Sequence, residues 1–521
     1  MMMVTWAWSL LSLLISAAIW YLFHDAEHME TRMEHTRRSW MNMSMYKNVL
    51  KRKKGEEMSS KIPRGSLGWP VIGETLEFIA SGYSSRPVAF MEKRKSLYGK
   101  VFRTNILGKP IIVSTDPDVN KAVLQNHGNV FIPSYPKSVT ELLGKSSILQ
   151  TNGPLQKRLH SLIGGYFRSP QFKSRIAREI EDYVKVSLST WEHKKLPILV
   201  QDETKQITFE ILVKVLMSVG PGEDMEFLKR EFQEFIKGII CIPIKFPGTR
   251  LYKSLQAKKK LFNMVRKIVE ERNLGMAKTG EKTSGSPIDV IQALLSDTKE
   301  SSDNTQQLQG LPLDIVTENI IEMMIAGEDS VPMVMTLAVK YLSDNPATLS
   351  RVVEENMTLK RQKATSCDGF AWTDYMSLQF TQNVITETLR MANIINAVWR
   401  KAQKDVEIKG FLIPKDWCVM TSFTSVHLDD ENYENPYQFN PWRWEKTRGM
   451  VNNSITFTPF GGGQRLCPGL ELSRLEISIF LHHFVTKYRW EVEDDNIVTF
   501  PTVKMKRKLP ITIVPMVQQH Y

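Results

Sequence analysis

The sequence predicts a mainly α-helical protein with a minor β component, built as one large domain behind a single N-terminal transmembrane helix. Three observations carry this prediction. Residues 4–23 form an uncharged apolar segment, apolar residues recur at helical spacing from residue 86 onward, and the alternating strand–helix pattern of a nucleotide-binding sheet is missing. With 42% hydrophobic and 24% charged residues in 521, the composition excludes collagen-like, disulfide-scaffold and largely disordered classes.

The N-terminal segment Val4–Phe23 is long enough to cross a bilayer as a helix, and Trp and Tyr residues lie near both of its ends. Basic residues follow it, at Arg32 and in Lys51–Lys54, which places the rest of the chain in the cytosol. A cleaved signal peptide with a small-residue site at Ser16–Ala18 is the alternative, but the basic n-region is missing. We therefore expect residues 1–23 to be a signal anchor.

A stalk and hinge are expected next, over residues 24–74. The first part is polar and mixed in charge, and Ile62–Glu74 is too rich in Pro and Gly for a helix or a central strand. Such a segment suits a stiff hinge between an anchor and a globular body. The globular domain is then expected over residues 75–521.

Within this domain, apolar spacing predicts a series of helices, two early strands and further strands near the end. The polar stretch 275–310 is expected to be loops around one short helix. The helices are expected near 170–192, 201–218, 223–238, 252–273, 313–343, 346–362, 378–391 and 469–487, and the strands at 100–104, 110–115, 405–420 and 497–515.

One of the four cysteines, Cys467, stands in a loop suited to holding a thiolate as a metal ligand. Glycines at 461, 462, 463 and 469 let the backbone fold closely around one atom, and Arg465 brings a positive charge. A helical pattern follows directly, so the thiol lies near a helix N-terminus, where partial positive charge favours a thiolate. A single cysteine in this setting suits one axial ligand of haem iron.

This loop resembles the haem-binding signature of the cytochrome P-450 superfamily, F-x-x-G-x-R-x-C-x-G, at Phe460, Gly463, Arg465, Cys467 and Gly469. The resemblance implies the cytochrome P-450 fold over residues 62–515. It also implies haem b (iron protoporphyrin IX) as cofactor, with Cys467 as the axial iron ligand.

The resemblance also implies a structural triad of one carboxylate and two guanidiniums. Glu387 and Arg390 form an E-x-x-R pair on a predicted helix, and Arg443 is the third member. A buried carboxylate shared by two guanidiniums is tolerable only if all three are satisfied. We expect this triad to hold the core behind the cysteine loop rather than to act in catalysis.

A polar patch interrupts the apolar helix predicted over 313–343. Pro332 lacks an N–H, so the carbonyl of Glu328 loses its helical partner and the helix is expected to kink or open there. By the resemblance, Asp329 and Ser330 are the acid and the alcohol that deliver protons to iron-bound dioxygen. Serine keeps the hydroxyl group of the threonine that is more usual at this position.

The haem propionates need cations, and Arg400 and Arg465 match family positions for this role. The early propionate motif, W-x-x-x-R in many members, is degraded here to residues 156–160. His160 or Lys157 is a possible substitute, and the sequence does not choose between them.

Several stretches resemble one group more closely, the plant steroid hydroxylases of brassinosteroid biosynthesis. Within this group, the resemblance is greatest to the enzymes that hydroxylate side-chain carbon 23, and carbon-22 hydroxylases are near relatives. The stretches are GSLGWPVIGE, GYSSRP, LCPGLELSRLEISIFLHHFVTKYRW and FPTVKMKRKLPI. An apolar steroid agrees with the residues expected to line the pocket. These are Phe131, Tyr135, Met323, Ala326, Ile395 and Val398, with Ala326 leaving room for a substrate carbon.

The function implied is hydroxylation of a steroid side chain with O2 and NADPH-derived electrons, supplied by a membrane-bound NADPH–cytochrome reductase at the endoplasmic reticulum. The net charge of +12 fits an acidic partner, and no basic stripe interleaved with aromatics supports nucleic-acid binding. Hydroxylation of another sterol or triterpenoid, and steroid binding without turnover, are the alternatives. A peroxide-rearranging enzyme is disfavoured by the Asp329–Ser330 pair.

Overall fold

A computed structural model describes residues 61–516, apart from 71, 85, 128, 195–196, 280–285, 297–309, 367–368, 446–453 and 501. Contacts within the chain define a compact unit that begins at Pro63, and all the elements below belong to it. The predicted anchor and the first part of the stalk, residues 1–60, lie outside the described residues. Within the described part of the chain, every helix is too short or too polar to cross a bilayer.

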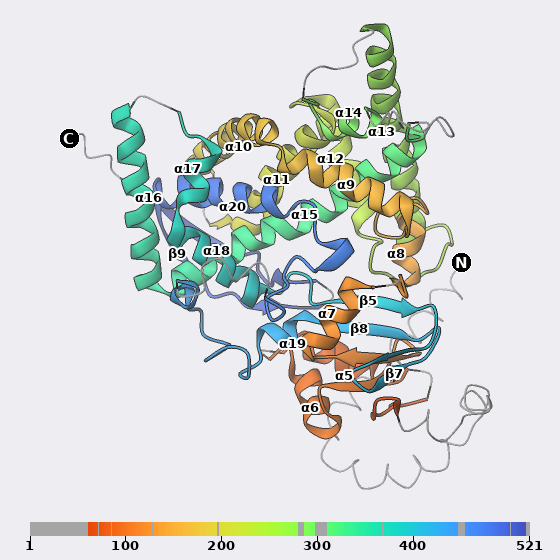
Figure 1. The fold of residues 1–521 in the computed structure, drawn as a ribbon. Coiled ribbons are helices and arrows are strands. Elements are labelled where there is room, and N and C mark those ends of the chain that lie inside the picture. The colour runs from red at the N-terminus through yellow and green to blue at the C-terminus, as the bar shows by residue number, and fades with distance from the viewer. Residues whose placement is uncertain are drawn as a thin grey trace, which may run out of the picture. The chain divides into compact units, whose positions relative to one another are not determined.

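The helical part of the unit is organised around α15 (Leu313–Asp344), a helix of 32 residues. It packs against α11 (Val200–Met217), α13 (Arg250–Thr279), α18 (Gln379–Ala392) and α20 (Leu470–Val485) (Figure 1). The second half of α15 is buried almost all round, as expected for a helix in the centre of a large core.

The remaining helices surround these, and their ends follow ordinary capping chemistry. At the start of α7, the Asp116 carboxylate accepts hydrogen bonds from the amides of Asp118 (2.9 Å) and Val119 (3.0 Å), and Asn126 ends the helix with a left-handed φ of 50°. The helices are α5 (Thr75–Ser81), α6 (Ala89–Tyr98), α7 (Pro117–Gln125), α8 (Lys137–Leu142), α9 (Pro154–Arg168), α10 (Pro170–Trp191), α12 (Glu223–Ile236), α14 (Val290–Leu295), α16 (Pro346–Ser366), α17 (Trp372–Ser377) and α19 (Phe423–His427).

The largest sheet has five strands in the order β1-β2-β8-β5-β3. They are β1 (Val101–Ile106), β2 (Lys109–Ser114), β8 (Cys418–Ser422), β5 (Ala397–Ala402) and β3 (Phe131–Pro133). β2 and β8 are parallel, and the other pairs are antiparallel. The pairing of β3 with β5 places Pro133 opposite Arg400, which brings this arginine to the site described below.

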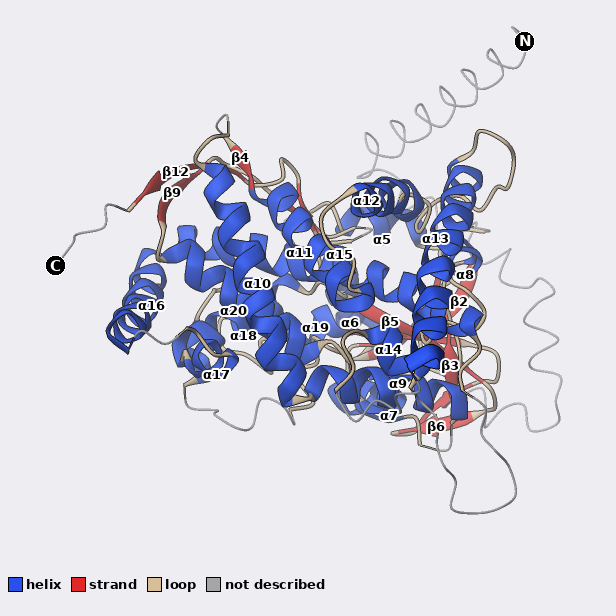
Figure 2. Cartoon of the chain, turned by 90° about the horizontal axis from the view of Figure 1, so that it is seen from above, coloured by secondary structure: helices blue, strands red, loops and turns tan. Residues whose placement is uncertain are grey.

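Three smaller sheets complete the β component, and Figure 2 shows the strands as a minor part beside the helices. One sheet joins β4 (Ile198–Leu199), β12 (Pro510–Pro515) and β9 (Tyr488–Val492). The others are the pairs β6 (Val406–Ile408) with β7 (Phe411–Ile413) and β10 (Ile497–Val498) with β11 (Lys504–Met505).

The Pro/Gly segment that precedes α5 lies along strand β1. Gly65 and Gly73 form isolated bridges to Arg103 and Ile106. A Cβ atom on Gly65 would lie 1.9 Å from the Arg103 carbonyl oxygen, and one on Gly73 would lie 2.2 Å from that of Asn105. The glycines are therefore needed for this close approach of two backbones.

The mainly α-helical composition with a small β component is confirmed, and each predicted helix is present within a few residues of its expected bounds. The short helix expected inside 275–310 is α14, although α13 continues to Thr279. The helices that were not among those predicted are α5, α6, α7, α8, α9, α17 and α19. The opening expected at Pro332 is wrong, because α15 continues through it to Asp344, and the kink that was the alternative stays a prediction.

Candidate active site

The cysteine loop is a tight turn that runs into α20. The Cys467 amide donates to the Phe460 carbonyl (3.0 Å), and Gly461 and Gly463 adopt left-handed φ values of 75° and 62°. A Cβ atom on Gly463 would lie 2.2 Å from the Leu124 carbonyl oxygen, so glycine is required where the loop meets the end of α7. Cys467 lies two residues before Gly469, the N-cap of α20.

The Cys467 side chain is exposed, although the surrounding protein is dense enough to desolvate its thiol. Burial raises the pKa of the thiol, and the Gly469 amide, which donates to the sulfur, opposes that rise. The Gly469 amide therefore acts in the direction expected from the sequence, while burial of the thiol opposes it. A bound metal ion deprotonates a coordinating thiol and would supply the missing charge.

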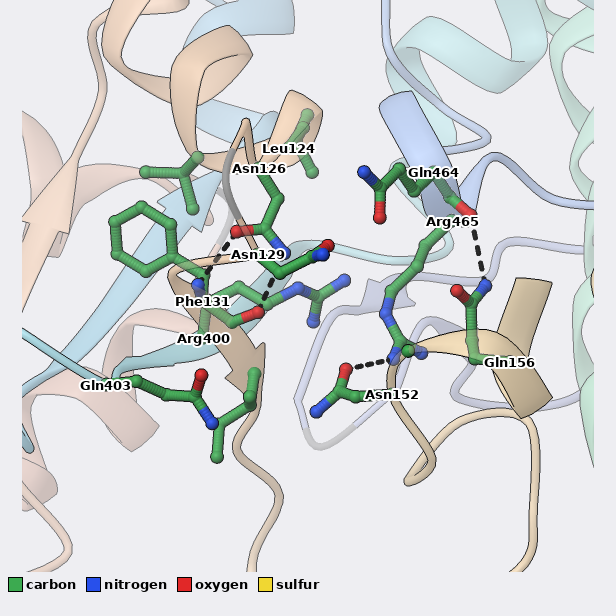
Figure 3. A pocket seen from close by; sticks show the side chains of 13 residues that line it. Leu124, Asn126, Asn129, Phe131, Asn152, Gln156, Arg400, Gln403, Gln464 and Arg465 are labelled. Carbon is green, nitrogen blue, oxygen red and sulfur yellow. Dashed lines mark hydrogen bonds between the residues drawn. The ribbon is translucent and has the colours of Figure 1, made fainter.

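A cavity of about 230 Å³ next to this loop contains the guanidiniums of Arg400 and Arg465 (Figure 3). Arg465 donates to the carbonyls of Ile148 (2.9 Å) and Thr151 and to Asn152 Oδ1 (2.6 Å). Burial and the neighbouring Arg400 charge lower the pKa of Arg465 to about 10. None of the described residues lining the cavity is acidic, so the two cations face a space suited to anionic groups.

The degraded 156–160 motif divides between two environments at the start of α9. Gln156 is buried, lines the same cavity and donates to the Gln464 carbonyl (3.1 Å). His160 instead bonds the carbonyl of Leu466 (2.6 Å), and Lys157 is exposed outside the cavity lining. Gln156 is thus the cavity-facing member that sequence reasoning missed, and the propionate role of His160 stays a prediction.

The three triad residues lie together and are fully satisfied. The buried Glu387 carboxylate accepts from Arg390 Nη2 (2.8 Å) and Nε (2.9 Å) and from Arg443 Nε (3.0 Å). It also accepts from the Asn440 amide (3.0 Å) and from Trp444 Nε1 (2.9 Å), which the sequence did not reveal. Arg390 Nη1 donates to the carbonyls of His427 and Pro436, each at 2.7 Å, so neither of these buried charges lacks partners.

His427 connects this triad to the cysteine loop. Its Nε2 accepts from the Thr458 amide (3.0 Å), and its Nδ1 therefore donates to Asn393 Oδ1 (2.8 Å) at the end of α18. Burial, with the nearby Arg390 charge, lowers the pKa of His427 to about 3, so the ring is neutral. A lone histidine at the end of a short helix carries no local sequence signal of such a role.

Both predicted proton-relay residues lie on α15, but neither bonds the other. The Asp329 carboxylate pairs with Lys205 of α11, and the Ser330 hydroxyl donates to the Ala326 carbonyl (2.7 Å). Ala326 is exposed on this helix, while the neighbouring Glu328 is buried.

The residues expected to line the substrate pocket are spread over several elements. Phe131 is buried and lines the cavity beside Arg400, and Tyr135 lies near Arg465. Ile395 has 51% of its surface exposed, and Met323 and Val398 are half-buried.

These residues fit a haem group. An exposed thiol follows a glycine loop, and two guanidiniums face a cavity free of carboxylates, as an iron ligand and two propionates require. Among the described residues, no group of three or more His, Cys, Asp or Glu side chains could hold a metal ion.

Residues 63–513 match the family model described as Cytochrome P450. The chain is a cytochrome P450. This P450 is 65% identical over 459 residues to 3-epi-6-deoxocathasterone 23-monooxygenase CYP90C1 of Arabidopsis thaliana, covering 88% of this chain and 85% of the relative. It is 52% identical to 3-epi-6-deoxocathasterone 23-monooxygenase CYP90D1 of the same plant, over 87% of this chain and 89% of the relative.

The P450 fold is also found by comparison with solved structures. Retinoic acid-bound cyanobacterial CYP120A1 superposes with a TM-score of 0.73 at 22% identity, covering 87% of this chain and 99% of that one. At this identity the likeness shows the fold alone.

Proposed function

We propose that this P450 is a haem-thiolate monooxygenase that hydroxylates carbon 23 of a plant steroid side chain in brassinosteroid biosynthesis. The observation that carries the proposal is the 65% identity, over most of both chains, to a relative named for that reaction. The second Arabidopsis relative carries the same activity in its name. Steroid hydroxylation also agrees with the largely apolar residues expected around the substrate.

In this proposal, haem would supply the activation of dioxygen, and the chain supplies ligands, charges and protons. Cys467 would hold the iron, while Arg400 and Arg465 would hold the carboxylates of the porphyrin edge. Glu387, through its contacts with Arg443 and its neighbours, holds the segment before the cysteine loop in place. Ser330 and Asp329 move protons along α15.

The setting we propose is the endoplasmic reticulum membrane. Residues 1–23 anchor the chain, the catalytic domain lies in the cytosol, and a membrane-bound reductase passes on electrons from NADPH. The apolar run and the basic residues after it support this arrangement. The positive net charge supports an acidic partner.

The test begins with the spectrum of the reduced protein with carbon monoxide, for wild type and Cys467→Ser. We expect a strongly red-shifted Soret band that the variant loses. Wild type is then incubated with reductase, NADPH and 3-epi-6-deoxocathasterone, and the product is identified by mass spectrometry and NMR. A product hydroxylated at carbon 22, or spectral binding without product, would overturn the carbon-23 assignment.

A further inference from the structure

A single lysine of α11 lies between two acidic side chains of α15. The Lys205 ammonium pairs with the Asp329 carboxylate and lies 3.7 Å from Glu328 Oε1. The two acids differ in burial, since 50% of the Asp329 side chain is exposed and only 9% of the Glu328 side chain. One cation thus serves one buried and one accessible carboxyl group.

Two carboxyl groups that share one ammonium cannot be ionised with equal ease. Burial and the Asp329 charge raise the pKa of Glu328 to about 7, and Lys205 acts in the opposite direction. Although burial opposes it, the charges of Asp329 and Glu328 raise the pKa of Lys205, so the ammonium stays charged. Glu328 is therefore the group that holds a proton near neutral pH.

The elements around this cluster contribute few other charges. From α11, Asp202 adds to the stabilisation of the Lys205 ammonium. From α20, Glu476 faces Thr208, one turn along α11 from Lys205. Nearby, Thr204 of α11 donates to the Pro332 carbonyl (3.2 Å), so the two helices are fixed against each other at this point.

The relay residues themselves are engaged elsewhere in this arrangement. Ser330 uses its hydroxyl proton in a bond to the Ala326 carbonyl, and Asp329 faces Lys205. To receive a proton, Asp329 needs a donor within reach, and Glu328 is the adjacent carboxyl group on the same ammonium.

We propose that Lys205 and Glu328 form a proton-holding station for Asp329, in which Lys205 positions the Asp329 carboxylate and Glu328 stores the proton that Asp329 passes on. This inference rests on the proposed monooxygenase function. The Glu328 carboxyl gives its proton to the Asp329 carboxylate, and Lys205 stabilises the Glu328 carboxylate that remains. Water reaching the exposed Asp329 restores the proton to Glu328, and no electrons move within the station.

The station is tested first without turnover. Infrared difference spectra of the haem-loaded resting protein, recorded from pH 5.5 to 8.5, report protonated carboxyl groups. We expect the difference between wild type and Glu328→Gln to contain one carboxylic acid band with a midpoint near pH 7, while the bands of the buried Glu322 and Glu476 remain in both proteins. Lys205→Met raises the midpoint by about one pH unit, because the cation that favours the ionised form is gone. Lys205→Arg leaves it near the wild-type value.

Turnover supplies the second measurement. For Lys205→Met and Glu328→Gln we expect roughly 10-fold less product per NADPH, more hydrogen peroxide and a larger solvent deuterium effect, with the steroid KM unchanged. The matched control is Lys214→Met, which removes the same charge from the same helix; Lys214 makes no ion pair among the described residues. Lys205→Arg restores coupling.

Several outcomes overturn the station. They are a wild-type minus Glu328→Gln difference spectrum without a carboxylic acid band, a midpoint that Lys205→Met does not move, and coupling in Lys205→Met equal to that in Lys214→Met. If the infrared titrations of all variants are as expected but wild type does not hydroxylate the steroid, the result would count against the proposed function instead. A thermal unfolding scan of each variant excludes loss of folding as the cause.

Discussion

Replacing Glu387 with glutamine removes one negative charge from a fully buried site that receives five N–H donors. Arg390, also fully buried, keeps its charge, and Arg443 is only 13% exposed. The glutamine NH2 group, moreover, faces donors rather than acceptors. Breaking a buried pair in this way costs about 3–5 kcal/mol.

The expected shift in unfolding temperature follows from the size of the domain. Roughly 450 residues at about 2.1 cal/mol/K each give an unfolding entropy near 0.9 kcal/mol/K, so Glu387→Gln lowers the apparent Tm by about 3–5 °C. The assay is thermal unfolding of the haem-loaded protein at one scan rate, with the red-shifted carbon monoxide band recorded as a measure of the cysteine loop.

The matched control is Glu431→Gln, since Glu431 also pairs with two cations, Lys95 (3.0 Å) and Lys100 (2.7 Å), but its side chain is 55% exposed. Exposed ion pairs contribute about 0–1 kcal/mol to the free energy of unfolding, so the apparent Tm of this variant stays within about 1 °C of the wild-type Tm. An equal decrease in Tm for Glu387→Gln and Glu431→Gln would refute the reasoning from burial.

Three further outcomes are expected. Gly463→Ala loses bound haem during gel filtration, because its Cβ would lie 2.2 Å from a backbone oxygen of α7, whereas Gly410→Ala, also at positive φ but with open space around it, retains haem. Glu476→Gln raises the Tm at pH 8 and not at pH 4. Burial raises the folded-state pKa of Glu476 to about 8, so the protein loses stability as the pH rises above the unfolded-state pKa of this group, near 4.5, and glutamine removes that loss. Equal Tm values of variant and wild type at pH 8 would contradict this. Between pH 6.5 and 3, His427→Gln loses less free energy of unfolding than wild type. The folded-state pKa of His427 is lowered to about 3, so in wild type the unfolded chain binds a proton first as the pH falls. The free energy of unfolding is measured by urea titration at each pH, and the same pH dependence in both proteins would count against this reasoning.

The parts of the fold that sequence predicts well are those with long, regular apolar spacing. Helix α15 is an example, because its core-facing residues outnumber its polar ones over 32 residues. The error at Pro332 has a local cause that sequence does not contain. The missing N–H leaves the Glu328 carbonyl without its helical partner, but α11 packs along α15 and the Thr204 hydroxyl of α11 lies 3.2 Å from the Pro332 carbonyl, so tertiary contacts keep the helix continuous.

The candidate site was predictable where its residues form a contiguous motif, as in the loop from Phe460 to Gly469. The groups that sequence missed act at a distance along the chain. Trp444 bonds Glu387 across 57 residues of chain, His427 bonds Thr458 across 31, and Lys205 meets Asp329 across 124. A single residue of common type has no spacing to mark it, so only the packing of α11 on α15 reveals such a pair.

The five-stranded sheet has a consequence for how the chain is synthesised. Strand β2 pairs with β1 at once through a hairpin, but its other edge waits for β8, with Ile111 opposite Cys418. The separation of about 300 residues takes roughly 15–60 s to translate at about 5–20 residues per second. During that time an apolar strand edge, including Ile112 and Val113, stays open to other chains. The yield of soluble protein should therefore fall when synthesis is slowed and rise with chaperones that cover this hairpin until the last fifth of the chain emerges.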